Sequence, residues 1–428
     1  MHILLATGMG PGIHEYGNMG DVSMLQVAVS RLKEQWSDAR IHVVTGSPAG
    51  LASYCPGCEA VPARGRNLWV GDELLLGPLG RVLPRTIYSL SVAIKRSLGF
   101  HSPRLLRFLL HLRLLAQTRR QEIADIDSFA DVLSRTDLIV VSGAGGFFDQ
   151  CRRWNMETLD IIEAGIWRKI PVAMLGQGLG PLSDPVVVAR AKRIFPALRL
   201  LTLRGSRGGS ELAASLGVRP SHIQIPGDEA IELAYARRAK EPGNALGINF
   251  RIAATAETDR SSVTPIRTII HRFARNHQAP LVPLPISFNP YADDARSIRE
   301  ILAGYDNESD GGATLDSPQA VIRETARCRV VVTGAYHAAV FALAQGIPVV
   351  ALSNSKYFST KFEGLKDQFG NGCSVLSAKE IDFSSKLEAA VETAWESAEK
   401  VRRPLEQAAL LQIDASRRSY VQLREALS

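Results

Sequence analysis

The stretch TGAYHAAVFALAQGIPVVAL, which runs from Thr333 to Leu352, decides the fold class. It continues the apolar strand Arg329–Val332 into a small-residue turn with a Tyr-His pair, and a helix of small residues follows. A Gly-Ile-Pro then leads into a second apolar strand. A buried strand, a helix and a second buried strand in this order predict a parallel sheet covered by helices. His337 is predicted to lie at the end of the first strand.

The same alternation recurs along the rest of the chain. The chain opens with strand Ile3–Ala6, a Gly-rich loop and helix Asp21–Trp36, and buried strands follow at Asp137–Ser142 and Pro171–Gln177. Residues 51–84, which are rich in Gly and Pro, are predicted to be irregular. An alternating series of strands and helices predicts a doubly wound α/β fold, in which ligands bind beyond the carboxyl ends of the strands.

The segment EPGNA, Glu241–Ala245, has the composition of a linker, and a new series of strands and helices begins after it. We therefore predict two doubly wound Rossmann-like domains that face a cleft. The first covers residues 1–240, with a helical insertion at about 86–130, and the second covers residues 241–428 and ends in C-terminal helices. A chain of 428 residues is long enough for two such domains.

The composition is that of an ordinary globular protein, with 46% hydrophobic and 22% charged residues. The formal charge of +7 is modest for this length, so it indicates no nucleic-acid partner; it suits anionic small molecules or an anionic membrane surface equally well. The five cysteines are few and odd in number, which argues against a disulfide framework and favours a reducing compartment. We expect neither a signal peptide nor a membrane-spanning helix, and therefore a cytoplasmic protein.

Glycines, arginines and one histidine follow successive predicted strands of both domains. In chain order these are Gly17–Asp21 (GNMGD), Gly143–Gly146 (GAGG), Gly176–Pro181 (GQGLGP), Arg204, Arg251 and the pair Tyr336–His337. Glycines let backbone N–H groups approach a ligand and arginines add paired donors, so the set predicts one cleft that binds an anion. The spacings match neither the Walker motif nor the dinucleotide motif, and GMGPG at Gly8–Gly12 lacks the required register.

Each of these residues also has a purely structural interpretation. Tight turns need glycine in any case, and Asn18 and Asp21 suit a turn and a helix N-cap. Arg204 could pair with Asp228, Lys361 could be solvated, and a histidine beside a strand end is often structural. The residues alone therefore leave both interpretations open.

Taken in order, the motifs resemble those of the polysaccharide pyruvyl transferase family. The resemblance covers about Ile3–Gly372 and rests on GNMGD, GAGG, GQGLGP, LTLRGSRGGSELAASLG, PGDEA, INFR, the late His337 and the block GIPVVALSNSKYFSTKFEGLKDQFG. It implies a GT-B-like fold and a transferase that moves pyruvate from phosphoenolpyruvate, as co-substrate, onto two hydroxyls of a sugar. The product is a ketal on a surface polysaccharide or on its lipid-linked precursor, which places the enzyme in the cytoplasm or at the inner face of the membrane.

The resemblance also implies roles for particular residues. His337 is the expected general acid, because an imidazole titrates near neutral pH and can protonate the alkene carbon of the donor. Asp21 or Asp228 would accept a proton from the sugar hydroxyl or bind the sugar. The expected donor-binding residues are Arg204, Arg251, Lys361, Tyr336 and Gly334, and the expected acceptor-binding residues are Asn18, Gly20, Gly145, Gly146 and Gln177.

One position departs from the family pattern. The chain has Ala335-Tyr336-His337 where the family usually has Arg-Leu-His, so an arginine expected to hold the donor is absent. Either Lys356, Arg207 or Tyr336 supplies the missing interaction, or this chain uses another donor. Two other functions therefore stay open: a GT-B glycosyltransferase that uses a nucleotide sugar, and a non-catalytic sugar-binding protein.

Three further features have two interpretations each. The segment Pro103–Arg120 is a basic amphipathic helix that would either lie on an anionic membrane or bury its leucines with its arginines outward. Phe147 and Phe148 would either stack on a sugar or pack in the core. The pair Asp293-Asp294 is predicted to start a helix rather than to bind a metal, and no metal is expected because ketal transfer needs none to generate its nucleophile. The sequence neither indicates nor excludes a homo-oligomer.

Overall fold

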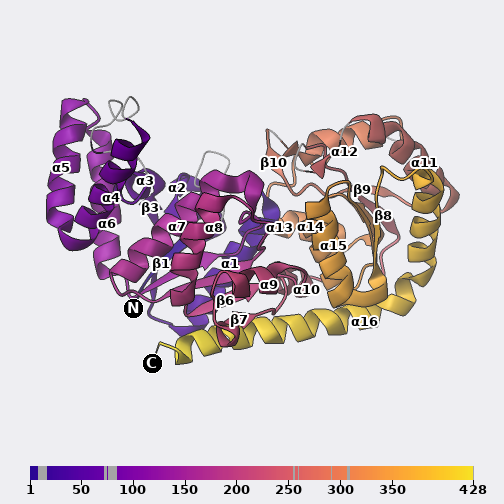
Figure 1. The fold of residues 1–428 in the computed structure, drawn as a ribbon. Coiled ribbons are helices and arrows are strands. Elements are labelled where there is room, and N and C mark those ends of the chain that lie inside the picture. Colours follow the sequence, from indigo (N-terminus) through magenta and orange to yellow (C-terminus); the bar gives the residue numbers. More distant parts are fainter. Residues whose placement is uncertain are drawn as a thin grey trace.

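The computed structural model describes residues 1–7, 17–71, 75, 84–253, 256–258, 260–290, 292–305 and 309–427 of the chain. Two parallel β-sheets lie next to each other, and one long helix runs along both domains (Figure 1). The motif at Gly8–Gly12 lies outside the described residues. Apolar cores pack on both faces of each sheet, as expected for doubly wound α/β domains.

The first sheet has seven parallel strands in the order β3-β2-β1-β4-β5-β6-β7. These strands are β1 (His2–Thr7), β2 (Arg40–Thr45), β3 (Glu59–Pro62), β4 (Leu138–Ser142), β5 (Val172–Gln177), β6 (Leu200–Leu203) and β7 (Ile223–Gln224). Leu5 of β1 lies opposite Val43 of β2 and Val140 of β4, and all three side chains are buried. Strands that are buried on both faces consist of consecutive apolar residues, which is why the sequence pattern predicted them.

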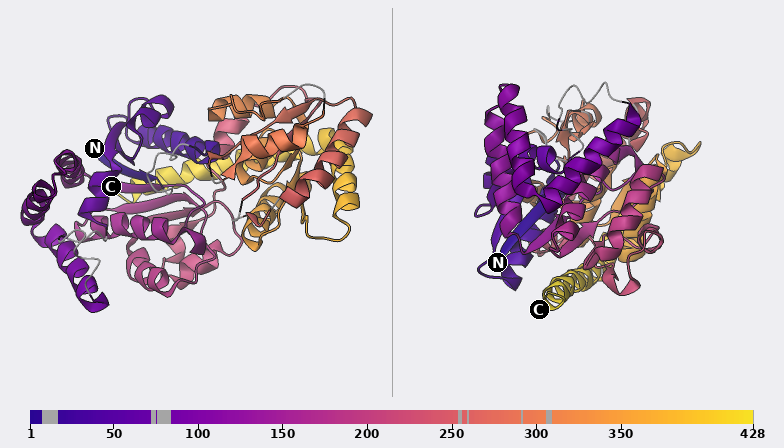
Figure 2. Two further views of the ribbon diagram at one scale, coloured as in Figure 1. Left: turned by 90° about the horizontal axis from the view of Figure 1, so that it is seen from above. Right: turned by 60° about the vertical axis from the view of Figure 1, so that its left-hand side comes forward.

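Helices cover this sheet and form the outer end of the first domain. They are α1 (Met19–Gln35), α2 (Pro48–Tyr54), α3 (Ala63–Trp69), α4 (Arg85–His101), α5 (Pro103–Ala116), α6 (Gln121–Arg135), α7 (Arg152–Trp167), α8 (Pro185–Ile194), α9 (Gly209–Ser215) and α10 (Ala230–Tyr235). Helices α4, α5 and α6 stand together at the end of the molecule that lies away from the second sheet (Figures 1 and 2).

The segment 51–84 is not irregular throughout, so that prediction was wrong. It contains the end of α2, strand β3 and helix α3. Strand β3 has only the sequence Glu-Ala-Val-Pro, which is too short to show a periodicity. It is a strand because it pairs along β2, with Val61 opposite Val44.

The second sheet has five parallel strands in the order β14-β13-β12-β8-β9. They are β8 (Ala245–Asn249), β9 (Leu281–Pro283), β12 (Cys328–Thr333), β13 (Val349–Leu352) and β14 (Cys373–Leu376). The helices of this domain are α11 (Val263–Asn276), α12 (Asp294–Leu302), α13 (Pro318–Thr325), α14 (Tyr336–Ala344) and α15 (Lys356–Phe369), and the short strands β10 (Phe288–Asn289) and β11 (Ala292–Asp293) pair before α12.

The stretch quoted first forms the end of β12, helix α14 and strand β13, and the two strands are neighbours in the sheet. All nine residues of α14 are buried. The alanines of α14 let it pack closely against the sheet and against α10, because small side chains allow backbones to approach. This packing holds Tyr336 and His337, the first two residues of the helix, at the carboxyl end of β12.

Helix α16 (Phe383–Glu425) contacts both domains over its 43 residues. Leu387 packs in the core beside the second sheet, Leu405 in the core around α14, and Tyr420 and Leu423 in a core of the first sheet. The helix therefore begins on the second domain and ends against the first (Figure 1). Amphipathic spacing predicts that a helix has a buried face, but it does not show which domain covers that face.

A short antiparallel contact joins the domains beside the cleft. Asn18, just before α1, bridges Ser287, just before β10. The N–H of Met19 donates to the carbonyl oxygen of Ile286 at 2.8 Å. The N-terminal end of α1 is thereby held against the second domain.

The end of α16 also reaches a buried carboxyl group. The hydroxyl of Tyr420 donates to Oε1 of Glu229, and both residues are buried. Burial raises the pKa of Glu229 to about 7, although the hydrogen bond from Tyr420 acts in the opposite direction. A glutamate in an unfolded chain has a pKa of about 4.3, so between about pH 4.3 and 7 the folded state binds a proton that the unfolded state has released. The contribution of the Glu229 carboxyl group to the free energy of unfolding is fully present below about pH 4.3 and is lost as the pH rises through about 7.

We predict that Glu229→Gln removes this loss and makes the protein more stable than the wild type at about pH 8, by up to about 3 kcal/mol. The measurement is the free energy of unfolding in urea at several pH values between about 5 and 8. Glu396→Gln, at an exposed position on α16, is the control and should keep the wild-type pH dependence. Identical pH dependence in Glu229→Gln and the wild type would contradict the prediction.

Candidate active site

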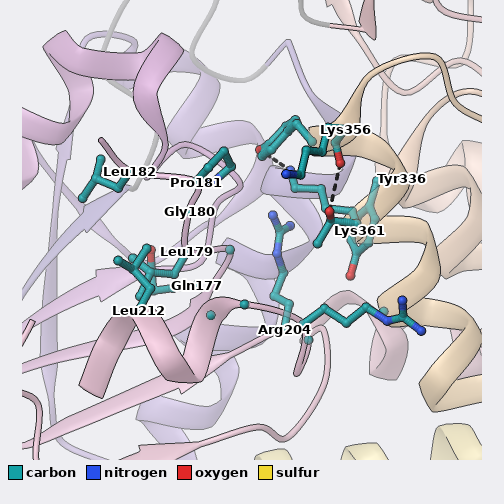
Figure 3. Close-up of a pocket in the computed structure, with 18 residues that line it drawn as sticks. Gln177, Leu179, Gly180, Pro181, Leu182, Arg204, Leu212, Tyr336, Lys356 and Lys361 are labelled. Atoms are coloured by element: carbon teal, nitrogen blue, oxygen red, sulfur yellow. Dashed lines mark hydrogen bonds between the residues drawn. The ribbon is translucent and has the colours of Figure 1, made fainter. Parts of the chain in front are cut away.

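The carboxyl ends of strands from both sheets meet between the domains, and two cavities open there. The polar cavity, of about 320 Å³, is lined by the start of α1, the loops after β4 and β8, and parts of α14 and α15. The glycine-rich cavity, of about 410 Å³, lies between the loops after β5 and β6 on one side and α15 on the other (Figure 3). Both cavities share a wall formed by Arg204, Tyr336, Tyr357 and Lys361, which we call the shared wall.

His337 lines the polar cavity and is only 5% exposed. Its ring packs against the first turn of α1, where a Cβ atom on Gly20 would come within 1.9 Å of the ring Cγ. The φ angle of Gly20 is not positive, so its backbone conformation does not require glycine. The glycine is needed because the imidazole occupies the place of a side chain.

Arg204, Asp228 and His337 form a buried cluster between the domains. Nε2 of His337 lies 3.4 Å from Nη1 of Arg204 and 3.5 Å from Oδ2 of Asp228, and the same Nη1 and Oδ2 atoms are 3.4 Å apart. Burial alone would raise the pKa of Asp228, but His337, Arg204 and the N–H of Ala230 hold it below its usual value. Asp228 is thus a carboxylate that orients the other two side chains, so the pairing of Arg204 with Asp228 that we considered is present.

Lys361 lies beside Arg204 on the shared wall. Burial, and then the charge of Arg204, lower the pKa of Lys361 well below its usual value. Its ammonium donates to the hydroxyl of Tyr357, and no carboxylate lies within ion-pair distance among the residues the structure describes. Nζ of Lys361 is 3.8 Å from the ring centroid of Tyr357, and the Arg204 guanidinium is 4.9 Å from that of Tyr336. Two neighbouring basic groups, of which only Arg204 pairs with a carboxylate, favour the binding of an anion.

Tyr357 connects the shared wall to the first domain. Its hydroxyl donates to the carbonyl oxygen of Gly145, and its ring stacks on Phe148 with centroids 4.1 Å apart. A Cβ atom on Gly145 would come within 2.6 Å of both Arg204 Nη2 and Lys361 Nζ. The GAGG loop therefore places its backbone directly against the two cations. Phe148 also lines the polar cavity, whereas Phe147 packs in the core.

Asp21 lies in the first turn of α1 and is half-buried at the polar cavity. Asn18 is the N-cap of this helix, and its side chain accepts two backbone N–H groups at 3.0 and 3.3 Å. Asn18 lines the polar cavity as well, so the capping role and a binding role are compatible. Burial raises the pKa of Asp21, against the effect of the nearby His337 and Arg204. A carboxyl group with a raised pKa in a cavity is suited to exchange a proton with a ligand.

Arg251 lines the polar cavity and is held by Asp294 in a bidentate ion pair, with N···O distances of 2.8 and 2.7 Å. Asp294 is wholly buried and also accepts from Asn249 and from the N–H of Ser287. Asp293 caps α12, so the pair does start a helix, as predicted. The fixing of Arg251 by Asp294 was not predicted. Among the described residues, Nη1 of Arg251 has no partner.

Two of the expected binding residues, Gln177 and Gly334, do not line the polar cavity. Gln177 lines the glycine-rich cavity, but its side-chain amide donates to three carbonyl oxygens of β4 and β5, at 2.8 to 3.1 Å, and links those strands. Gly334 lines a separate small cavity beside Arg251. Gly145 and Gly146 line the polar cavity together with Asn18 and Asp21.

Tyr357, Trp154 and Asn289 line the polar cavity and were not predicted. Tyr357 precedes Lys361 by four residues on α15, so helical spacing could have placed both side chains on one face. Trp154 and Asn289 carry no comparable signal, because the residues they meet in the cavity come from other elements.

The structure distinguishes the three residues that could replace the missing arginine at position 335. Arg207 forms a bidentate ion pair with Asp367, at 2.5 and 2.7 Å. Tyr336 is uncharged, because burial raises its pKa. Lys356 is exposed at the glycine-rich cavity and has no charged partner in the part of the chain that is described (Figure 3). Lys356 is therefore the cation that remains available to a ligand there.

Neither a metal-binding cluster nor a membrane-spanning helix is found in the described ranges. No three His, Cys, Asp or Glu side chains there are grouped closely enough to hold a metal ion. None of the described helices combines the length and the apolar character that crossing a bilayer requires.

Solved structures with the same fold include sugar-nucleotide enzymes. A protein from Listeria monocytogenes described as a UDP-N-acetylglucosamine 2-epimerase is 12% identical, with a TM-score of 0.56 over 97% of this chain and 94% of that chain. The Neisseria meningitidis UDP-GlcNAc 2-epimerase bound to UDP-GlcNAc is 12% identical, with a TM-score of 0.54 over 99% and 100%. The glycotransferase of kitacinnamycin is 13% identical, with a TM-score of 0.51 over 100% and 99%. At these identities the similarity establishes the fold alone: the protein has the GT-B-like architecture that the sequence predicted, with two Rossmann-like domains facing a cleft.

Comparison with sequence models of protein families identifies the family of this chain. The model for polysaccharide pyruvyl transferase matches residues 18–356, and the chain belongs to this family. The resemblance drawn from the ordered motifs is thereby confirmed. Among curated proteins no match was found.

We predict that Lys361 reacts with a small amine-acylating reagent at a lower pH than an exposed lysine does, because burial and Arg204 lower its pKa. The extent of modification would be followed by mass spectrometry between about pH 6 and 10, with the exposed Lys240 as the internal reference. Arg204→Gln should raise the pH of half-modification of Lys361 by on the order of one unit and leave Lys240 unchanged. Matching profiles for the two lysines in the wild type would contradict the prediction.

Proposed function

We propose that the protein transfers pyruvate from phosphoenolpyruvate onto two hydroxyls of a sugar and forms a ketal on a surface polysaccharide or its lipid-linked precursor. The observation that carries the proposal is the shared wall, where Lys361 has no carboxylate partner among the described residues and Arg204 adds a second cation. Membership in the pyruvyl transferase family supports a transferase. The donor is an anion with two charged groups, and the cavity offers cations where such groups would bind.

Three cations can hold the donor. Arg204 and Lys361 lie on the shared wall, and Arg251 lines the polar cavity with its guanidinium fixed by Asp294. A phosphate between Arg204 and Lys361 would raise the pKa of Lys361 and keep the lysine charged. A carboxylate at Nη1 of Arg251 would complete the interactions of that guanidinium.

His337 and Asp21 perform the proton transfers in this proposal. His337 donates a proton to the methylene carbon of phosphoenolpyruvate; the electrons of the double bond form the new C–H bond, and the adjacent carbon becomes electrophilic. The first sugar hydroxyl attacks that carbon and gives its proton to Asp21. The second hydroxyl forms the other C–O bond as the bond to phosphate breaks, and inorganic phosphate leaves with that electron pair. The proton of the second hydroxyl restores His337, and Asp21 passes its proton to phosphate, so atoms and charges balance without a redox step.

The acceptor sugar fits the side of the polar cavity that the first domain forms. Trp154 offers an aromatic face, and Asn18 and Asn289 offer amide groups to hydroxyls. Asp228 takes no part in proton transfer, because its lowered pKa keeps it ionised beside Arg204 and His337.

We predict that His337→Ala lowers the rate of sugar-dependent phosphate release from phosphoenolpyruvate about 10²- to 10⁴-fold, because the general acid is lost. Phosphate release would be measured with candidate sugar acceptors, and the ketal would be identified by mass spectrometry. Arg237→Ala, at an exposed position on the first domain, is the matched control and should retain wild-type activity. Unchanged turnover in His337→Ala would remove His337 from the mechanism.

We also predict that Arg204→Gln weakens phosphoenolpyruvate binding about 10- to 100-fold, because a charge-assisted interaction contributes roughly 1.5–3 kcal/mol. The measurement is titration calorimetry with the folded variant, whose fold is checked by circular dichroism. Equal affinity of the variant and the wild type would place the donor elsewhere.

A nucleotide-sugar glycosyltransferase is the second candidate function. The glycine-rich cavity, of about 410 Å³, is in the size range of sites for larger ligands, and its cation Lys356 has no charged partner in the described residues. One structure with the same fold is bound to UDP-GlcNAc. The third candidate, a non-catalytic sugar-binding protein, would bind a carbohydrate and turn over neither donor.

Gly364→Ala separates the two donors. A Cβ at Gly364 meets no atom within 4 Å, and the residue lines the glycine-rich cavity within α15. Alanine is the better helix former, so the variant should be as stable as the wild type or more stable, by up to about 1 kcal/mol, while its methyl group narrows the cavity. If the donor is a nucleotide sugar, UDP should raise the melting temperature of the wild type and raise that of Gly364→Ala less. A shift with phosphoenolpyruvate and none with UDP would exclude this candidate.

A further inference from the structure

Helix α5 is apolar on two opposite faces. Leu106, Leu110 and Leu114 are fully buried against the rest of the domain. The other apolar side chains recur every three or four residues along the opposite face and are exposed: Leu105 47%, Phe108 57%, Leu112 48% and Leu115 47%. We call these four residues the outer face of α5. Single exposed leucines are common on proteins, but a continuous helical stripe of them indicates a binding surface.

Two basic residues of α5, Arg107 and Arg113, are turned to the side of the helix or inward, whereas Arg104 is exposed. Arg107 pairs with Asp127 and Asp131 of α6, at 2.7 and 2.9 Å, and Arg113 is 8% exposed. The structural alternative for this segment, with leucines buried and arginines outward, holds in part: Leu106, Leu110 and Leu114 are buried and Arg104 is exposed, but the leucines and Phe108 of the outer face are exposed as well. The burial of Leu106, Leu110 and Leu114, together with the pairing of Arg107 with α6, leaves the four apolar side chains of the outer face exposed.

Helix α4 repeats the arrangement. Val92 is buried on its inner side, while Ile87, Leu90 and Ile94 are 49%, 61% and 49% exposed and recur at the same helical spacing. Both helices stand at the outer end of the first domain, away from the second (Figures 1 and 2). This location keeps the two apolar stripes clear of the cleft.

The charges identify the partner. Residues 84–120 contain no Asp or Glu. Of their basic side chains, Lys95 and Arg113 are buried, and Arg96, Arg107 and Arg119 pair with carboxylates of the same domain. Arg104 and Arg120 are exposed and have no partner among the described residues. A second copy of the chain would bring like charges together, whereas an anionic lipid surface would attract them and accept the apolar stripes between its headgroups.

We propose that the outer faces of α4 and α5 bind the surface of an anionic lipid bilayer. The leucines and Phe108 enter the boundary between headgroups and acyl chains, and Arg104 and Arg120 contact the headgroups. The protein then contacts the bilayer through the outer end of its first domain, away from the second domain. The inference does not depend on the chemistry in the cleft.

Vesicle flotation of the full-length protein tests the proposal. The wild type should float with phosphatidylcholine vesicles that contain phosphatidylglycerol, about tenfold more than with phosphatidylcholine alone, and high salt should weaken the binding. Phe108→Ser/Leu112→Ser should reduce flotation about tenfold or more, because two apolar side chains leave the bilayer. Leu411→Ser, at a 71% exposed leucine on α16, is the matched control and should float like the wild type.

Three outcomes would overturn the proposal. Equal flotation of the wild type with both kinds of vesicle, or none, would exclude anionic lipid as the partner. A dimer by light scattering that the double variant abolishes, without flotation, would assign the outer faces to a second copy. Reduced flotation in Leu411→Ser to the same extent would show a non-specific effect of exposed leucines. Phosphate release with a water-soluble acceptor should be the same in the double variant and the wild type, so failure of this inference is distinguishable from failure of the proposed reaction.

Discussion

The buried cluster of Arg204, Asp228 and His337 is the interaction on which the cleft depends. Arg204 directly follows β6, Asp228 lies two residues before the start of α10, and His337 is in the first turn of α14. Removing charges from water is costly, so such a cluster persists only where each charge has partners and the surrounding packing holds it. Two glycines follow from it directly: Gly20 leaves room for the imidazole, and Gly145 leaves room for the guanidinium.

Neighbouring groups in the cleft differ in charge because their environments differ. Burial raises the pKa of Glu229, whose partner is the neutral hydroxyl of Tyr420, whereas His337, Arg204 and a backbone N–H hold the pKa of the adjacent Asp228 below its usual value despite its burial. Lys361 shows the same principle for a cation, because burial beside Arg204 lowers its pKa. The pKa values of these two adjacent carboxyl groups are therefore shifted in opposite directions. Asp228 contacts Arg204 and His337, and Glu229 accepts a hydrogen bond from Tyr420 of α16.

Much of the fold could be predicted because its signals are local. Strands such as β4 are consecutive apolar residues, Asn18 is a recognisable N-cap, and the small residues of α14 predict a helix that packs closely. Partners could not be predicted with the same success, because they lie far apart in the chain: Arg204 and His337 are 133 residues apart, and Tyr357 and Gly145 are 212 residues apart. For α5 the sequence was ambiguous, since leucines occupy most of its circumference, and its contacts with the rest of the domain, which include the ion pairs of Arg107 with α6, decide which side is buried.

The sequence by itself determined the alternation of strands and helices, the glycines and charged residues at the strand ends, and the family. It determined them because backbone conformation, helix capping and hydrophobic periodicity depend on residues close together in the chain. Only the tertiary structure decided that Gln177 links two strands and that Asp294 holds Arg251. It also decided that Lys361 lies beside Arg204 and has no carboxylate partner among the described residues, and that α16 returns to the first domain. These outcomes depend on which distant side chain fills the same space, and burial then sets the charge of each group.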